Sequence, residues 1–142
     1  LNSRGFVMLG DGECNEGSVW ESAMMASAQN LNNLIVFVDF NKWQATGRSE
    51  EILSLDPLVD KWRAFGWDAY EIDGHNMEQV AKVFSTKRSN KSKPLAVIAN
   101  TVKGKGVSFM EDDNNWHYRI PNVDEVLLSY KELGFSNREV KS

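Results

Sequence analysis

Four short apolar runs, separated by segments of helical character, limit the folds open to this chain more than any other feature. The runs are Gly5 to Leu9, Leu34 to Asp39, Trp67 to Ile72 and Leu95 to Asn100. Each has the length of a strand, and the alternation of strands with helices is typical of a parallel sheet. We therefore predict an α/β fold in which a parallel sheet is flanked by helices on both faces.

Four segments between and after these runs predict helices, because their apolar residues recur at helical spacing. They are Glu16 to Asn30, a helix that Asp56 caps and Gly66 ends, a helix that Asn76 caps, and Val123 to Gly134. Pro57 suits the first position of the second helix, where no backbone N–H is needed. The polar stretch from Ser108 to Pro121 and the basic stretch from Lys87 to Lys93 are predicted to be loops.

Length and composition indicate an ordinary globular protein, and we assign residues 1–142 to a single domain. Of the 142 residues, 42% are hydrophobic and 25% are charged, which suffices for a packed core. The formal net charge of −4 gives no electrostatic reason to expect a nucleic acid or an anionic membrane as partner. We find no apolar stretch of ~20 residues that could span a membrane and no signal peptide. The single cysteine favours a reducing compartment, so the expected location is the cytoplasm.

Two polar residues follow directly after the first two apolar runs. Asp11 lies in Gly10-Asp11-Gly12 after the first run, and Asn41 comes after the second. A strand, a crossover helix and a second strand place the two strands parallel, so that their carboxyl ends share one edge of the sheet. Asp11 and Asn41 should therefore converge there. One carboxylate and one amide oxygen are ligands that Mg²⁺ accepts while it keeps positions for phosphate oxygens.

Several of these residues also have simpler explanations when each is taken alone. Asp11 can be a turn residue that caps the following loop. Cys14 can be a small residue in a tight loop, since no His or Lys neighbour in the sequence lowers its pKa. His75 is expected to shape a turn. The stretch Lys103 to Gly106 lacks the spacing of a nucleotide-binding P-loop, although it follows a strand.

The residues around Asp11 and Asn41 resemble one enzyme family. The tripeptide Gly-Asp-Gly, followed further along the chain by an asparagine, is the cofactor signature of thiamine-diphosphate-dependent enzymes. The run LGDGECNEGSVWESAMMASAQNLNNLIVFVDFNKWQATG, the segments DKWRAFGW and EIDGHN, and NTVKGKGVSFMEDDNNWH are similar to the transketolase family. The similarity is greatest to its separately encoded amino-terminal subunits, which bind the diphosphate, and it spans Gly5 to His117.

The resemblance implies a set of site residues. It implies that Asp11, Asn41 and the backbone carbonyl of Trp43 bind the metal, as Mg²⁺ or as Ca²⁺ or Mn²⁺ in its place. It assigns cofactor binding to Asp11, Gly12, Glu13, Asn41 and His117, with the N–H of Gly12 able to face a phosphate oxygen. His117 is also the expected catalytic residue, although the family's usual glycine after it is Tyr118 here.

Two acidic residues at the start of the first predicted helix have two explanations. Glu16 and Glu21 can favour the positive end of the helix dipole. The resemblance implies instead that they lie near a subunit contact that links two cofactor sites, as in a dimer. Both explanations remain open from the sequence.

The resemblance implies a function, with a partner. We expect transfer of a two-carbon ketol unit between sugar phosphates with thiamine diphosphate and Mg²⁺, as one subunit or part of one. The glutamate that activates the cofactor comes in this family from a pyrimidine-binding domain, often on a separate carboxyl-terminal subunit, so we expect a homo- or hetero-oligomer. The family also has loops before GDG that touch the diphosphate, so we expect an amino-terminally truncated domain that is inactive without its partner.

Three alternatives remain. The first is another thiamine-diphosphate enzyme, such as a 1-deoxyxylulose-5-phosphate synthase. The second is a truncated, noncatalytic module that keeps the fold but binds the cofactor poorly. The third is a generic nucleotide-binding α/β domain, which no P-loop or GxGxxG match in the sequence supports.

Overall fold

The chain divides into two compact units, Leu1–Thr101 and Val102–Ser142. The structure is a computed structural model, and it describes residues 3–85 and 92–135. Most of the predicted basic loop from Lys87 to Lys93 lies outside the described residues. The assignment of the whole chain to one domain stays a prediction.

The first unit is built on a parallel sheet of four strands in the order β1-β2-β6-β5. The strands are β1 (Gly5–Gly10), β2 (Leu34–Phe40), β5 (Asp68–Asp73) and β6 (Leu95–Asn100). The α/β fold and its four predicted strands are thus confirmed, with bounds that differ by one residue at most places. Trp67 precedes β5 instead of beginning it, and its indole N–H donates to the carbonyl of Ala23 at 2.9 Å.

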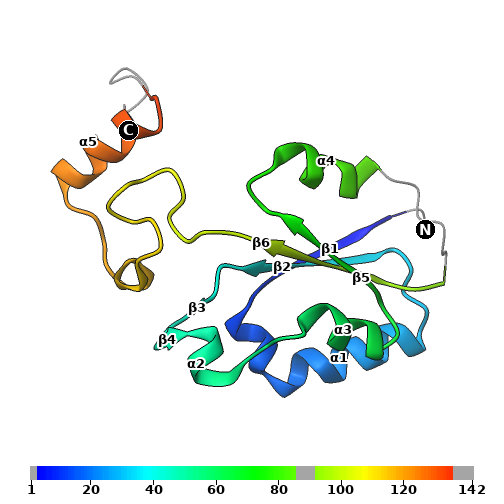
Figure 1. The fold of residues 1–142 in the computed structure, drawn as a ribbon. Coiled ribbons are helices and arrows are strands. Elements are labelled where there is room, and N and C mark those ends of the chain that lie inside the picture. Colours follow the sequence, from blue (N-terminus) through cyan, green and yellow to red (C-terminus); the bar gives the residue numbers. More distant parts are fainter. Residues whose placement is uncertain (1–2, 86–91, 136–142) are drawn as a thin grey trace. The chain divides into compact units, whose positions relative to one another are not determined.

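Helices cover both faces of the sheet (Figure 1). The helices α1 (Gly17–Ala28) and α3 (Leu58–Ala64) lie on one face, and α4 (Met77–Ser85) lies on the other. The chain moves across the sheet from β1 to β2 and on to β5, and then steps back to β6. Because parallel crossovers are right-handed, the backward step requires its helix on the opposite face, which is where α4 lies.

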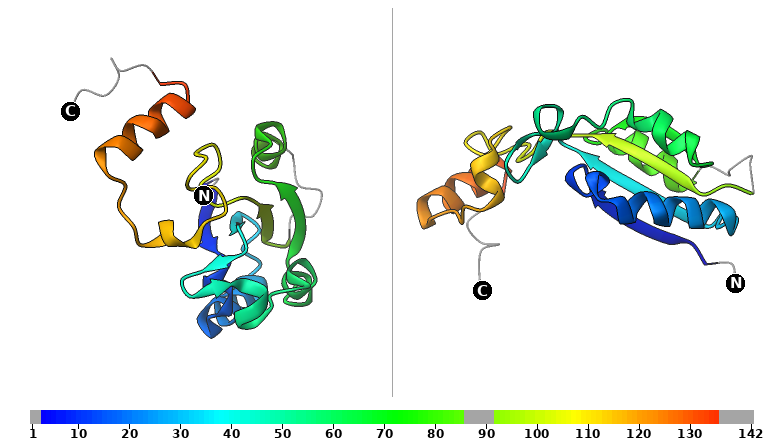
Figure 2. Two further views of the ribbon diagram at one scale, coloured as in Figure 1. Left: turned by 60° about the vertical axis from the view of Figure 1, so that its left-hand side comes forward. Right: turned by 90° about the horizontal axis from the view of Figure 1, so that it is seen from below.

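The core consists of two layers, one on each face of the sheet. Alternating side chains of β2 and β6 contribute to both layers. Val36, Val38 and Ile98 pack on the face of α1 and α3, together with Trp62 of α3. Neighbouring residues of the same strands, Ile35, Phe37, Leu95 and Val97, pack toward Val83 of α4. Both central strands are therefore buried on both sides, which explains why their sequences are continuously apolar. Figure 2 shows that β1 forms one edge of this sheet.

The predicted helix signals are correct in part. Asn76 caps α4, since its side-chain oxygen accepts from the N–H groups of Glu78 at 3.0 Å and Gln79 at 3.1 Å. The prediction that Asp56 caps the second helix is wrong. Pro57 has an extended backbone at φ −83° and ψ 102°, so it takes the N-cap position without a side-chain cap and the helix begins at Leu58.

The second unit contains a short 3-10 helix, η2 (Asn114–His117), and the helix α5 (Val123–Glu132). The 3-10 turn lies inside the stretch predicted to be a loop, whereas α5 matches its prediction. A carboxylate on α5 ties the unit together: Glu132 accepts the N–H of Ser108 at 2.7 Å and its hydroxyl at 2.5 Å. These hydrogen bonds lower the pKa of the Glu132 carboxyl.

Candidate functional site

The carboxyl ends of β1 and β2 meet, as the sequence predicts. Gly10 stands opposite Asp39 in the parallel register. The next residue, Asp11, donates its N–H to the carbonyl of Asp39 at 3.2 Å and accepts the N–H of Lys42 at 2.8 Å through Oδ2. Lys42 reaches this position with a left-handed backbone at φ 69°. The turn after Asn41 is therefore bonded directly to the Asp11 side chain.

The Asp11 carboxylate is 2% exposed and is bound by three donors. Oδ1 accepts the N–H of Gly12 at 2.9 Å, and Oδ2 accepts the hydroxyl of Ser49 at 2.8 Å in addition to the N–H of Lys42. Burial raises the pKa of the Asp11 carboxyl above its ordinary value. The three hydrogen bonds act in the opposite direction, and the charge of Asp39 adds to the rise in pKa. A cation beside Oδ1 would offset the cost of burying this charge.

Asn41 is held in a fixed orientation by its neighbours. Its Nδ2 donates to Oδ2 of Asp39 at 3.1 Å, and its Oδ1 accepts the N–H of Trp43 at 3.0 Å. The other carboxylate oxygen of Asp39 accepts the hydroxyl of Thr101, which follows β6. Asp39 thus orients the Asn41 amide and links the ends of β2 and β6.

A small hairpin follows Asn41. The strands β3 (Trp43–Gln44) and β4 (Gly47–Arg48) pair antiparallel, and the guanidinium of Arg48 lies 3.8 Å from the centre of the Trp43 ring. The short helix α2 (Ser49–Leu53) begins directly after β4 and places Ser49, which is 2% exposed, against Asp11. The hairpin therefore fixes both the Trp43 backbone and the Ser49 hydroxyl.

Gly12 and Glu13 have partners inside the chain. The N–H of Gly12, expected to face a phosphate oxygen, donates to Oδ1 of Asp11. Oε2 of Glu13 accepts the N–H of Gly10 at 2.7 Å. Neither Gly10 nor Gly12 has a positive φ, so the backbone conformation itself does not demand glycine there.

Cys14 is a buried residue of the 3-10 helix η1 (Gly12–Asn15). Burial raises the pKa of its thiol to about 12, with smaller contributions from the charges of Asp11 and Glu13. A thiol with this pKa is protonated near neutral pH and is a poor nucleophile. The structure agrees with the simpler explanation of Cys14 as a small residue in a tight loop.

The remaining predicted site residues lie elsewhere in the chain. Glu16 takes the N-cap position of α1 without a side-chain cap bond, and both it and Glu21 are exposed. His117 ends η2 in the second unit, where it is exposed and its ring stands edge-on to Tyr118 with the centres 4.7 Å apart. The roles assigned to these three residues stay predictions.

Sequence reasoning missed three residues that surround the Asp11 side chain and Asn41. Asp39 counts only as the last residue of a predicted strand, Thr101 only as the residue that follows one, and Ser49 lies in a segment for which we predict no element. Position at a strand end is a signal that could have found the first two. No local pattern marks Ser49, because its contact with Asp11 spans 38 residues.

The described part of the chain contains no group of three or more His, Cys, Asp or Glu side chains that could hold a metal ion. The predicted ligand set does not need one, since it combines a single carboxylate with an amide oxygen and a backbone carbonyl. Among the helices in the described residues, none has the length and hydrophobicity to cross a membrane.

Comparison with known proteins identifies the family. The family described as transketolase, thiamine diphosphate binding domain, matches residues 1–141. The chain belongs to the transketolase family. Its similarity to this thiamine diphosphate-binding domain covers both units, including every predicted site residue.

Two transketolase relatives illustrate how much of a longer protein the chain represents. It is 44% identical over 128 residues to one subunit of the apulose-4-phosphate transketolase of Actinobacillus succinogenes, covering 90% of this chain and 46% of that protein. It is 46% identical over 106 residues to one subunit of the 6-deoxy-6-sulfo-D-fructose transketolase of a Clostridium species, covering 75% of this chain and 38% of that protein. The chain spans less than half the length of these relatives.

Solved transketolases share the fold. The enzyme from Campylobacter jejuni aligns with a TM-score of 0.88 at 23% identity, over 96% of this chain and 21% of that one. The Pichia stipitis transketolase in complex with sedoheptulose 7-phosphate aligns with a TM-score of 0.86 at 26% identity, over 95% of this chain and 20% of that one. The predicted thiamine diphosphate-binding fold is thus confirmed.

Proposed function

We propose that the chain is the diphosphate-binding part of an enzyme that transfers a two-carbon ketol unit between sugar phosphates, with thiamine diphosphate and Mg²⁺. The observation that supports this most is the buried Asp11 carboxylate, hydrogen-bonded to the turn that follows Asn41. Membership of the transketolase family supports the same function.

The residues present fit a divalent cation. Asp11 is a buried carboxylate whose pKa is raised mainly by burial, so its ionised form gains from a nearby positive charge. Oδ1 accepts one hydrogen bond and keeps further acceptor capacity. Asp11, the Asn41 side-chain oxygen and the Trp43 carbonyl would hold Mg²⁺ in this proposal, with its remaining positions taken by oxygens of the diphosphate and water.

An unpaired donor supports an anionic group at the same place. The Gln44 side chain packs 3.5 Å from where a Cβ on Gly12 would stand, and its buried Nε2 has no hydrogen-bond partner. Buried polar groups normally have partners. A small movement of Gln44 would let this amide donate to a diphosphate oxygen beside the Gly-Asp-Gly turn.

Other residues have roles in the proposal. Thiamine diphosphate, when bound, supplies the carbon that accepts and releases the two-carbon unit. His117 is the catalytic residue in this proposal: it contacts cofactor and substrate and acts as an acid or base toward a sugar hydroxyl. Glu16 and Glu21 lie at a subunit contact. A partner subunit with the pyrimidine-binding domain supplies the activating glutamate, and the relatives named as transketolase subunits support a partner. The complex works in the cytoplasm.

Calorimetric titration with thiamine diphosphate and Mg²⁺ tests the proposed anchor. The wild-type chain should bind thiamine diphosphate only when Mg²⁺ is present. Asp11→Asn and Asn41→Ala should each weaken binding by at least roughly tenfold, since the first removes the negative charge of a metal ligand and the second removes a ligand oxygen. Asp60→Asn, which changes an exposed carboxylate on α3, is the control and should bind as wild type. Equal binding by all four chains would point to the noncatalytic module.

Turnover in the presence of the partner subunit tests the reaction. Xylulose 5-phosphate, apulose 4-phosphate and 6-deoxy-6-sulfo-D-fructose are the ketol donors to compare, each with an aldose phosphate acceptor. The last two are the sugars in the relatives' names. Pyruvate with glyceraldehyde 3-phosphate is the competing pair. Turnover of that pair alone would favour a 1-deoxyxylulose-5-phosphate synthase and reject ketol transfer.

A further inference from the structure

The turn that carries His117 is anchored through the residue before it. The indole N–H of Trp116 donates to the carbonyl of Phe109 at 2.7 Å, and the two rings meet edge to face with their centres 5.1 Å apart. Trp116 is only partly exposed, whereas His117 is exposed. The backbone on the amino-terminal side of His117 is therefore fixed by packing and by a hydrogen bond.

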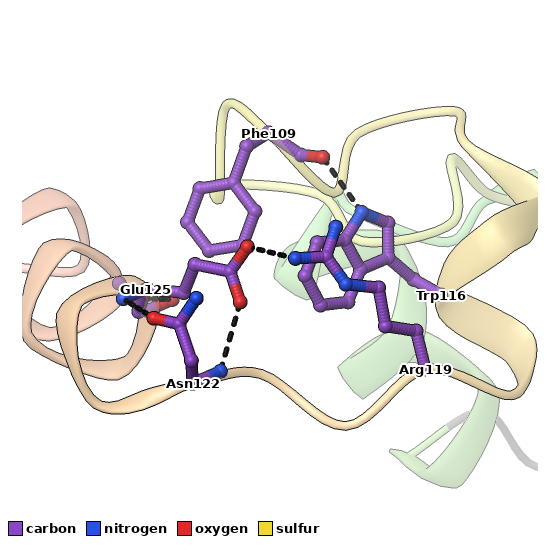
Figure 3. Close-up of polar contacts among 6 residues, drawn as sticks. Phe109, Trp116, Arg119, Asn122 and Glu125 are labelled. Atoms are coloured by element: carbon purple, nitrogen blue, oxygen red, sulfur yellow. Dashed lines mark hydrogen bonds and ion pairs between the residues drawn. The ribbon is translucent and has the colours of Figure 1, made fainter.

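On the other side of His117, Arg119 makes two contacts at once (Figure 3). Its guanidinium lies 4.4 Å from the centre of the Trp116 ring, and it forms an ion pair with Oε1 of Glu125 in the first turn of α5. The other oxygen of Glu125 accepts the N–H of Asn122 at 2.8 Å, and Asn122 Oδ1 accepts the N–H of Glu125 at 2.9 Å. Glu125 thus completes a capping box and holds Arg119.

We propose that Arg119 is a positioning residue for His117: stacked on Trp116 and bonded to Glu125, it fastens the His117 turn to the start of α5. This inference rests on the proposed function, in which His117 contacts cofactor and substrate. Trp116, Arg119 and Glu125 form a clamp around this turn, and Tyr118 within it has φ −119° and ψ −25°, a conformation that does not require glycine.

The chemistry of the clamp favours arginine. An exposed ion pair alone contributes little, and the Arg119 side chain is 52% exposed. The planar guanidinium, however, stacks on an indole while its edge meets a carboxylate, which a lysine cannot do equally well. The Glu125 side chain is only 20% exposed and is already oriented by the capping box, so its ordering for Arg119 costs little further entropy.

Hydrogen exchange tests the clamp without cofactor or substrate. The exchange rate of the Trp116 indole N–H, measured by NMR on the full chain, should rise roughly tenfold in Arg119→Ala and less in Arg119→Lys. Glu125→Gln should also raise it, because glutamine keeps the capping box but loses the charge. Asp60→Asn, which breaks an exposed ion pair with Arg63, is the matched control and should change nothing. Unchanged exchange in Arg119→Ala would overturn the clamp.

Steady-state kinetics with the partner subunit test the positioning of His117. Arg119→Ala should lower kcat on the order of tenfold, because a misplaced catalytic group loses rate. In a His117→Ala background, the same change should have no further effect. A full loss on top of His117→Ala would show that Arg119 does not act through His117 and would overturn the inference. If wild-type enzyme turned over no ketol donor, the proposed function would fail, while the exchange result would still decide whether the clamp exists.

Discussion

Replacing Ser49 by alanine tests how the buried Asp11 carboxylate is stabilised. The Ser49 hydroxyl donates to Oδ2 of Asp11 at 2.8 Å, and both residues are 2% exposed. A hydrogen bond to a charged group contributes about 1.5–3 kcal/mol. Ser49→Ala should lower the free energy of unfolding by that amount at a pH above the folded-state pKa of Asp11, where the carboxyl is ionised. Ser54→Ala, at an exposed position just beyond α2, should have a much smaller effect.

The loss should depend on pH in a defined direction. Burial raises the folded-state pKa of Asp11 above the unfolded value, so the folded protein binds this proton more tightly. The free energy of unfolding therefore falls as the pH rises from the unfolded-state pKa of Asp11 to its higher folded-state pKa. Removing Ser49, whose bond lowers the pKa, raises the folded value further and widens that window. The destabilisation caused by the mutation should thus grow with pH between the folded pKa of the wild type and the higher folded pKa of the mutant, and then level off.

Urea unfolding at several pH values measures both effects. Below the unfolded pKa, the mutant should lose only about 1 kcal/mol, the contribution of a neutral hydrogen bond. Above the raised folded pKa, the loss should reach the larger figure. A loss that is the same at every pH, or that is smaller above the folded pKa than in acid, would refute the argument that Ser49 stabilises an ionised Asp11.

Three further outcomes follow from the structure. Cys14, with a thiol pKa of about 12, should react with a disulfide reagent at pH 7.5 only on unfolding; rapid labelling of folded protein would contradict its burial. Trp67→Phe should destabilise more than Trp62→Phe by about 1 kcal/mol in urea, because it removes the indole hydrogen bond to the Ala23 carbonyl, whereas the Trp62 indole N–H has no partner to lose. Asn122→Ala should speed amide exchange in α5, since loss of an N-cap costs about 1 kcal/mol; unchanged exchange would mean the cap is not needed.

The strands and most helices were predictable because their signals are local. β6 has the predicted bounds, since a short and continuously apolar run is typical of a parallel strand that is buried on both faces. Asn76 caps α4 through bonds to residues two and three positions away, so the cap is visible in the sequence. The hairpin of β3 and β4 has strands of two residues each, too short to leave a hydrophobic period. The start of α3 was mispredicted because Pro57 is extended there.

The sequence by itself determined how the sheet strands and the main helices alternate along the chain. It also determined the convergence of Asp11 with the turn after Asn41 and the resemblance to transketolases. These follow from periodicity, from the geometry of parallel strands and from motifs contiguous in the chain. Only the tertiary structure decided what surrounds the site: the hydroxyl of Ser49 on Asp11 and the link from Asp39 to Thr101. These bonds join residues 38 and 62 positions apart, and burial sets their strength, so no local pattern records them.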